Sequence, residues 1–150
     1  MPEVFFYHLQ GRSIESTLPT LLEKSLERGW RVVVQGGSDE RVSALDALLW
    51  TYRDESFLPH GPSSDRDASE YPIVLTARDE PIDAARVRFL IDGASLPQDE
   101  DRYERIVVLF DGSDEEALER AREQWREARG RGLDVTYWQQ DSRGRWERRA

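Results

Sequence analysis

Residues 4–35, VFFYHLQGRSIESTLPTLLEKSLERGWRVVVQ, contain the pattern of a complete strand–helix–strand unit. The run is mostly β-branched and aromatic at its start, which predicts a buried strand, and it ends in RVVVQ, a continuously apolar strand typical of parallel sheets. Leucines at helical spacing between the strands predict a helix that begins between Ser13 and Thr17, because Pro19 is expected in a first turn. Such a unit favours right-handed parallel packing.

The next segment continues this alternation. Gly36-Gly37 turns the chain into a second helix, which we expect to be capped by Ser38 or Asp39 and to end near Thr51. Residues 52–70 are rich in Asp, Ser, Pro and Gly and are expected to form one long connection.

The rest of the sequence, after residue 70, predicts further strands of a mixed sheet and one more helix. A capping box at residues 113–116 opens a last helix that runs to about Gly130, and residues 92–102 are expected to be a polar loop. The overall prediction is an α/β fold: a single three-layer domain, residues 1–150, with a mixed, mostly parallel sheet flanked by helices. The further strands are expected at residues 73–76, 87–91 and 105–110, with an edge hairpin from residues 135–140 and 144–147.

Composition excludes several classes of function. The formal net charge of −9 argues against a dedicated nucleic-acid binder. The absence of Cys excludes disulfides, thiolate catalysis and zinc ribbons, and with only two His we expect no metal and no cofactor. No apolar stretch approaches the roughly 20 residues that span a bilayer, and the N-terminus lacks the basic segment of a signal peptide. We therefore expect a cytoplasmic protein without membrane contact.

The charge is unevenly distributed along the chain. Residues 120–150 hold nine basic and five acidic side chains, although the whole chain is acidic, and Lys24 is the only basic residue that is not Arg. An acidic body with a basic end predicts a local anionic partner.

Two positions are candidates for sites of chemistry. Gly36-Gly37 lies between a strand and a helix, where a phosphate can bind, but the surrounding sequence lacks both common phosphate-binding motifs. The alternative is a tight turn that requires positive φ. His60 has no nucleophile or carboxylate at a catalytic spacing, so we predict no catalytic residue.

The last helix carries a basic stripe beside an apolar shoulder. At 100° per residue, Arg126 lies about 40° and Arg129 about 20° from Arg122 around the helix. Leu118 and Trp125 lie between this stripe and the face expected to pack on the sheet. Guanidinium groups beside an apolar surface suit a ligand that has both carboxylate and apolar groups. The residues expected to face the sheet are Ala117, Ala121 and Ala128.

A solvated helix face is the alternative interpretation. The arginines would then pair with glutamates one turn away, and Trp125 would only cover the core. Spacing alone leaves both interpretations open. Trp50, at the end of the second helix, and Phe57, in the following loop, are likewise open as core residues or as binding residues.

A family resemblance extends these observations. Residues 45–50, LDALLW, followed by residues 55–60, ESFLPH, resemble the hallmark of the chi subunit of bacterial DNA polymerase III. The Phe6-Tyr7 strand, the strand at 31–34 and the helix motif AREQW at 121–125 follow in matching order, so the resemblance covers essentially the whole chain. It implies a fold similar to mononucleotide-binding proteins but without a nucleotide site, and a non-catalytic role in DNA replication.

The resemblance also implies partners and a binding site. Chi subunits link the clamp-loader complex, through the psi subunit, to single-stranded-DNA-binding protein, so single-stranded DNA is reached mainly indirectly. The family's pocket takes the acidic, Phe-ending C-terminal tail of that protein. Trp50 and Phe57 match the apolar wall of that pocket, and Arg122 matches the residue that holds the carboxylates. Leu118 stands where the family can carry a basic residue, so Arg126 or Arg120 would supply that charge.

We therefore expect the end of the second helix and the last helix to lie together. Trp125, where the family can carry Tyr, completes the shared apolar shoulder. The predicted peptide-binding residues are Trp50, Phe57, Leu118, Arg122, Trp125 and Arg126.

Two other classes of function remain open. One is a small enzyme or nucleotide-binding protein that acts on an anionic ligand at Gly36-Gly37. The other is a direct single-stranded-DNA binder that stacks bases on Trp and attracts phosphates with Arg. The enzyme lacks a catalytic group, and the net charge of −9 opposes the DNA binder.

Overall fold

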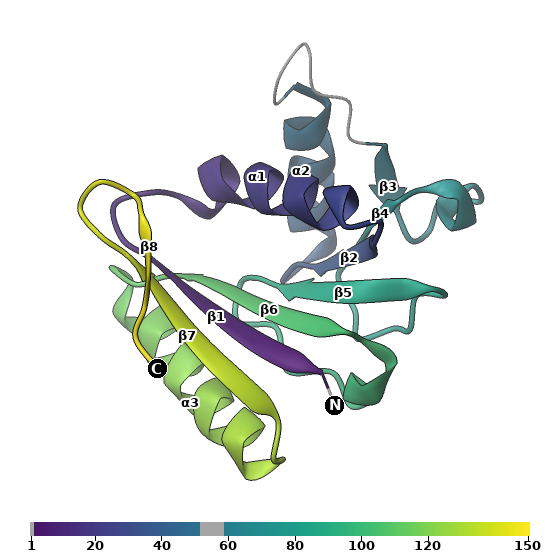
Figure 1. The fold of residues 1–150 in the computed structure, drawn as a ribbon. Helices are drawn as coiled ribbons and strands as arrows, with labels where there is room; N and C mark the ends of the chain where they lie inside the picture. The colour runs from purple at the N-terminus through teal and green to yellow at the C-terminus, as the bar shows by residue number, and fades with distance from the viewer. Residues whose placement is uncertain (1, 52–58) are drawn as a thin grey trace.

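The computed structural model describes residues 2–51 and 59–150 and shows one sheet with helices on both faces (Figure 1). The helices are α1 (Ile14–Glu27), α2 (Asp39–Thr51) and α3 (Glu115–Gly130), with short 3-10 turns η1 (Ala68–Glu70) and η2 (Glu100–Arg102). The strands are β1 (Glu3–Leu9), β2 (Arg31–Gln35), β3 (His60–Pro62), β4 (Ile73–Thr76), β5 (Ala85–Leu90), β6 (Arg105–Asp111), β7 (Asp134–Gln140) and β8 (Trp146–Arg148).

The sheet has the order β3-β4-β2-β5-β6-β1-β7-β8. Each neighbouring pair is parallel except β7 and β8, which form the predicted edge hairpin. The predicted α/β class with a mixed, mostly parallel sheet is confirmed. No helix in the described part of the chain is both long enough and apolar enough to cross a membrane.

Two apolar cores lie on the two faces of the sheet. The first joins α1 and α2 to the sheet through residues such as Leu22 and Leu45. The second joins α3 to the opposite face through Ala121 and Ala128, which pack with Phe6 and its neighbours. Figure 1 shows α1 and α2 above the sheet and α3 below it. The central strands are mostly apolar because helices cover both of their faces.

The first helix begins within the predicted range. The hydroxyl of Ser13 caps it and accepts a hydrogen bond from the Ser16 N–H at 3.1 Å. Pro19 nevertheless lies in the second turn, so its expected place in a first turn is wrong. Proline at this depth removes one helical hydrogen bond, and its ring is buried with the neighbouring Leu18.

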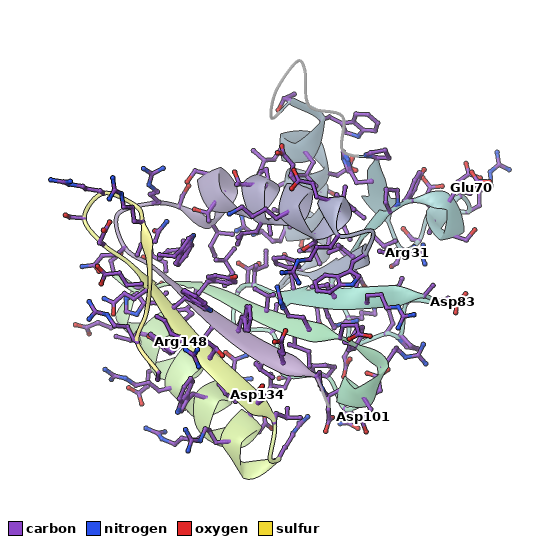
Figure 2. All side chains as sticks on the ribbon, in the orientation of Figure 1. Arg31, Glu70, Asp83, Asp101, Asp134 and Arg148 are labelled. Carbon is purple, nitrogen blue, oxygen red and sulfur yellow. The ribbon has the colours of Figure 1, made fainter. Side chains whose placement is uncertain are left out.

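The long connection predicted over residues 52–70 is wrong from His60 onward. Residues 60–62 form the edge strand β3, which pairs with β4, and residues 68–70 form η1. Arg31, at the start of β2, lies on the same side of the molecule as Glu70 of η1 (Figure 2). Its guanidinium holds this region because it donates to the carbonyls of Ala68 at 2.6 Å and Tyr71 at 2.9 Å. A His-Gly-Pro strand has no strand-like sequence pattern, so only its tertiary pairing reveals it.

The cap of α3 also differs from the prediction. Asp114, not Ser113, is the capping residue, and its carboxylate accepts from the N–H groups of Glu116 at 3.0 Å and Ala117 at 3.3 Å. Ala121 and Ala128 face the sheet as predicted, while Ala117 is only partly buried. The buried face of α3 also includes Gln124, which the apolar pattern did not reveal.

Candidate functional site

Among the described residues, the peptide-binding candidates on α2 and α3 do not form one pocket, because these helices pack on opposite faces of the sheet. Trp50, in the last turn of α2, lies beside β3 at one edge. Arg122 lies on the helix that covers β6, β1 and β7. From β3 to β1 there are five strand spacings, or roughly 24 Å. The expectation that the end of α2 meets α3 is therefore wrong.

The handedness of the connections explains this separation. From β1 to β2 and from β2 to β3 the chain moves one way across the sheet, whereas from β6 to β7 it moves the other way. Right-handed crossovers in opposite directions place their helices on opposite faces. The sequence pattern predicted the helices but contained no information on the strand order.

Trp50 lies on the surface instead of in the core. Its side chain is the exposed large apolar group among the described residues, at 58% exposure. The indole lies 4.6 Å from the ring of His60, measured between centroids. His60 is buried, with Nε2 3.0 Å from the Asp46 carbonyl oxygen and 3.3 Å from the Asp46 carboxylate. The core interpretation of Trp50 is wrong, and Phe57 lies outside the described residues.

The predicted residues on α3 do lie together. We name Leu118, Arg122, Trp125, Arg126 and Arg129 the α3 surface. The three arginines are exposed, while Leu118 and Trp125 are half-buried against the core. Arg122 pairs with a glutamate one turn away at 3.4 Å, as in the solvated-face interpretation. Arg126 and Arg129 form no ion pair within the described ranges, so this surface presents uncompensated positive charge beside apolar groups.

An aromatic cluster that the sequence pattern did not reveal adjoins this surface. The ring of Trp125 lies 5.5 Å from Phe6 and 5.6 Å from Tyr137. The Tyr137 hydroxyl and His8 Nδ1 share a hydrogen bond of 2.7 Å, and Phe110 packs 5.2 Å from the His8 ring. Alternation along β1 predicts that Phe6 and His8 share one face of that strand, and alternation along β7 likewise assigns Tyr137 to one face of its own strand. That β1 and β7 are neighbours could not be predicted.

Electrostatic effects link Arg122 to this cluster. Burial lowers the pKa of His8, and the charge of Arg122 lowers that pKa further, whereas Asp111 raises it. Burial raises the pKa of Tyr137, and Arg122 opposes this increase. Gly112 makes room for the histidine, because a Cβ there would overlap His8 Nε2. The charge of Arg122 on the α3 surface therefore acts on two members of this cluster, His8 and Tyr137.

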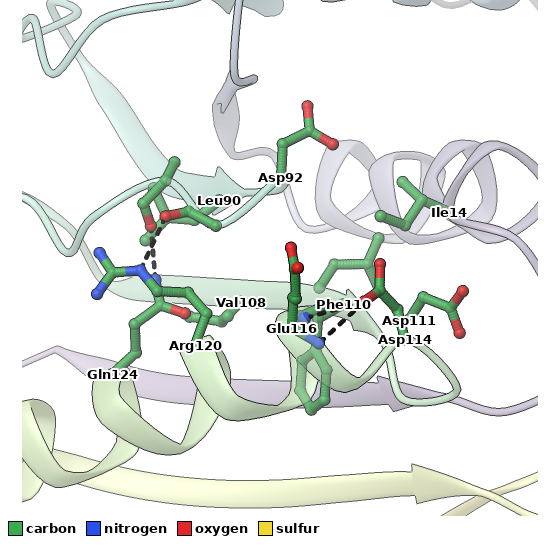
Figure 3. A pocket seen from close by; sticks show the side chains of 14 residues that line it. Ile14, Leu90, Asp92, Val108, Phe110, Asp111, Asp114, Glu116, Arg120 and Gln124 are labelled. Atoms are coloured by element: carbon green, nitrogen blue, oxygen red, sulfur yellow. Dashed lines mark hydrogen bonds between the residues drawn. The ribbon is translucent and has the colours of Figure 1, made fainter.

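The place where nucleotides bind in similar folds is acidic here. A cavity of about 430 Å³ opens at the carboxyl ends of β5 and β6, beside the start of α3. Figure 3 shows the carboxylates of Asp92, Asp111, Asp114 and Glu116 around it. The capping carboxylate of Asp114 already accepts from the first N–H groups of α3. Arg120 also lines the cavity, but a phosphate would meet four carboxylates against this one cation, so the cavity disfavours nucleotides.

The Gly36-Gly37 turn already holds a carboxylate from the same chain. Asp92 accepts from the Gly37 N–H at 3.0 Å and from Arg41 Nε at 3.1 Å. Neither glycine has positive φ, so the expected conformational reason is wrong. The glycines instead permit close contact, because a Cβ on Gly37 would lie 3.1 Å from the Cβ of Asp92. Across residues 2–51 and 59–150, no group of three His, Asp or Glu side chains could hold a metal ion.

Comparison with known proteins agrees with the fold and with the sequence motifs. Residues 1–136 match the family described as DNA polymerase III chi subunit, HolC. A relative from Rickettsia prowazekii (strain Madrid E), named "Probable DNA polymerase III subunit chi", is 25% identical over 117 residues, which cover 74% of this chain and 71% of the relative. The chain therefore belongs to the chi subunit family of DNA polymerase III, whose members are non-catalytic accessory subunits that act in DNA replication.

Proposed function

We propose that this chi-family protein binds the acidic, Phe-ending C-terminal tail of single-stranded-DNA-binding protein on the α3 surface. Through this contact it links that protein to the clamp-loader complex of the polymerase holoenzyme. The observation that carries the proposal is the exposed row of Arg122, Arg126 and Arg129 beside the half-buried ring of Trp125. Such a surface combines the two chemistries that the tail requires.

Each part of the tail has a chemical counterpart on the α3 surface. Arg122 and Arg126 can each hold a carboxylate with two parallel hydrogen bonds, which lysine cannot do with the same geometry. The terminal Phe ring would pack on Leu118 and Trp125. The protein carries a net charge of −9, so an acidic tail is repelled from most of the molecule and is attracted only where cations gather.

We place the clamp-loader contact, through the psi subunit, on the Trp50 surface, which comprises Trp50 with the exposed Ala47 and Thr51. An exposed Trp is a common centre of a protein interface. The Trp50 surface and the α3 surface lie on opposite faces of the sheet. Both partners could therefore be bound at the same time, as a linking subunit requires.

A peptide titration tests the proposed tail site. A fluorescent acidic peptide that ends in Phe should bind the wild-type protein, and Arg122→Ala should weaken this binding roughly ten- to hundredfold, because a charge-assisted hydrogen bond is lost. Removing the terminal Phe from the peptide should also weaken binding. The control is Arg143→Ala, which removes an exposed arginine from the β7–β8 turn and should change little.

Trp50→Ala separates the two surfaces. It should leave the peptide affinity unchanged and should reduce co-purification with the clamp-loader complex. The proposal for the α3 surface is wrong if a folded Arg122→Ala variant binds the peptide like wild type, or if Trp50→Ala abolishes that binding.

A further inference from the structure

A second candidate binding site lies on the face of the sheet opposite the α3 surface. A pocket of about 360 Å³ lies between α1 and the strands β1, β6 and β7. We name it the α1-side pocket. Figure 1 shows α1 and α3 on opposite sides of the sheet. The lining residues used below are the aromatic Phe5, Tyr7 and Trp138 and the basic Lys24, Arg28 and Arg105.

The floor of the α1-side pocket is aromatic. The ring of Phe5 lies 6.1 Å from Tyr7 and 6.3 Å from Trp138, both in edge-to-face arrangements. The indole Nε1 of Trp138 is buried and has no hydrogen-bond partner in the described chain. Trp138 therefore contributes its ring, and not this inaccessible N–H, to the floor of the pocket.

The rim of the α1-side pocket is basic. The guanidinium of Arg105 lies 4.1 Å from the centroid of Phe5 and also contacts the Glu3 carboxylate at 3.0 Å. Lys24 and Arg28, in the last turn and at the end of α1, are exposed and form no ion pair among the described residues. Three cations thus face one carboxylate, on a protein whose net charge is −9.

We propose that the α1-side pocket binds one nucleotide of single-stranded DNA. The base would stack on the indole of Trp138, and the phosphate would lie between Lys24 and Arg28. Aromatic platforms flanked by cations are the common means of binding single strands without sequence preference. The volume is near the lower end for small-ligand sites, which suits a single base better than a length of peptide.

A direct DNA contact goes beyond the proposed function. The α1-side pocket and the α3 surface lie on opposite faces, so a DNA strand and a protein tail would not compete for space. Trp138 also lies outside the residues that match the family, which end at residue 136. The direct DNA contact would thus depend partly on a segment beyond the shared family region.

The test is a titration with a labelled oligothymidylate of about 16 nucleotides. At about 50 mM salt the wild-type protein should raise its fluorescence anisotropy. Trp138→Leu should weaken binding about five- to hundredfold, the range for loss of one stacked base. Because that change could also disturb the hairpin, the second variant is Lys24→Gln/Arg28→Gln on the surface of α1. It should weaken binding and reduce the salt slope by roughly 0.7 for each phosphate that is no longer neutralised.

Matched controls separate this site from overall charge and from the α3 surface. Arg66→Gln/Arg143→Gln removes the same charge from exposed positions elsewhere and should leave oligonucleotide binding nearly unchanged. Arg122→Ala should also leave it unchanged, while Lys24→Gln/Arg28→Gln should leave binding of the acidic peptide unchanged. The inference is overturned if wild type does not bind the oligonucleotide, if the folded pocket variants bind like wild type, or if they lose the acidic peptide instead.

Discussion

Arg88 is a charged side chain with no solvent exposure, near the middle of β5. Its guanidinium donates twice to the Gln35 side-chain oxygen, at 2.6 and 3.1 Å, and once to the Tyr103 hydroxyl at 3.1 Å. It also donates to the carbonyls of Arg78 at 2.7 Å and Glu80 at 2.9 Å. These contacts use all five of its N–H groups. One buried cation therefore holds β2, β5 and two loops together.

Arg88→Leu should lower the free energy of unfolding by about 2–5 kcal/mol, because it leaves several buried acceptors unpaired. Urea denaturation followed by far-UV circular dichroism would measure the change. Arg86→Leu is the matched control on the same strand, since Arg86 is 59% exposed and meets Glu104 only at 3.5 Å. The control should change the free energy by less than about 1 kcal/mol. Equal effects of the two substitutions would show that the network around Arg88 does not stabilise the fold.

His8 gives the fold a dependence on pH. Its pKa is lowered in the folded protein, mainly by burial, while the unfolded value is about 6.5. As pH falls below that value, the unfolded chain takes up a proton that the folded protein resists, so stability is full above about pH 6.5 and decreases below it. The free energy of unfolding should therefore fall between about pH 7 and 5.5, and His8→Leu should lose this component of the slope. An unchanged slope in the variant would contradict a lowered pKa of His8 in the folded protein.

At the scale of elements, the start of α3 provides a direct comparison of two caps. Asp114→Ala removes the carboxylate that accepts from Glu116 and Ala117, and should destabilise the protein by about 1 kcal/mol. Ser113→Ala removes only an exposed hydrogen bond to Asp111 and should have a smaller effect. Thermal melting of both variants would measure this. A larger loss for Ser113→Ala would support the capping box that the sequence predicted.

Most elements could be predicted because their patterns are local. The strand 31–35 contains three consecutive valines, and the leucines of α1 repeat at helical spacing, so both follow from neighbours in the sequence. Two features could not be predicted in this way. Strand β3 depends on pairing with β4, and Pro19 is tolerated in the second turn of α1 within a buried apolar face. Both depend on tertiary contacts that local propensity does not describe.

At the scale of the whole molecule, the order of the strands determines which of the predicted site residues lie together. The basic stripe of α3 and its neighbour Trp125 could be predicted from helical spacing, and the structure shows them together. Trp50 could not be placed, because the face that a helix occupies depends on the direction of its crossover in the sheet. His8 and Tyr137 were missed for the same reason, since they meet only because β1 and β7 are neighbours.

The chain's own carboxylates lie where parallel α/β sheets commonly bind nucleotides. The carboxyl ends of β5 and β6 meet the start of α3, the usual position of a phosphate. The Asp92 carboxylate accepts a hydrogen bond from the Gly37 N–H in the Gly36-Gly37 turn, and the Asp114 carboxylate accepts one from the Glu116 N–H at the start of α3. The two surfaces that we propose as binding sites lie instead on the outer faces, on α3 and at the end of α2.

The most direct measurement of the central claim is a map of backbone amide chemical shifts in isotope-labelled protein during titration with the acidic, Phe-ending peptide. We predict that the largest changes lie in residues 118–129 of α3 and at Tyr137 of β7, with little change around Trp50 and β3. Changes concentrated at the end of α2, or no changes in α3 at saturating peptide, would contradict the proposal that the α3 surface binds the tail.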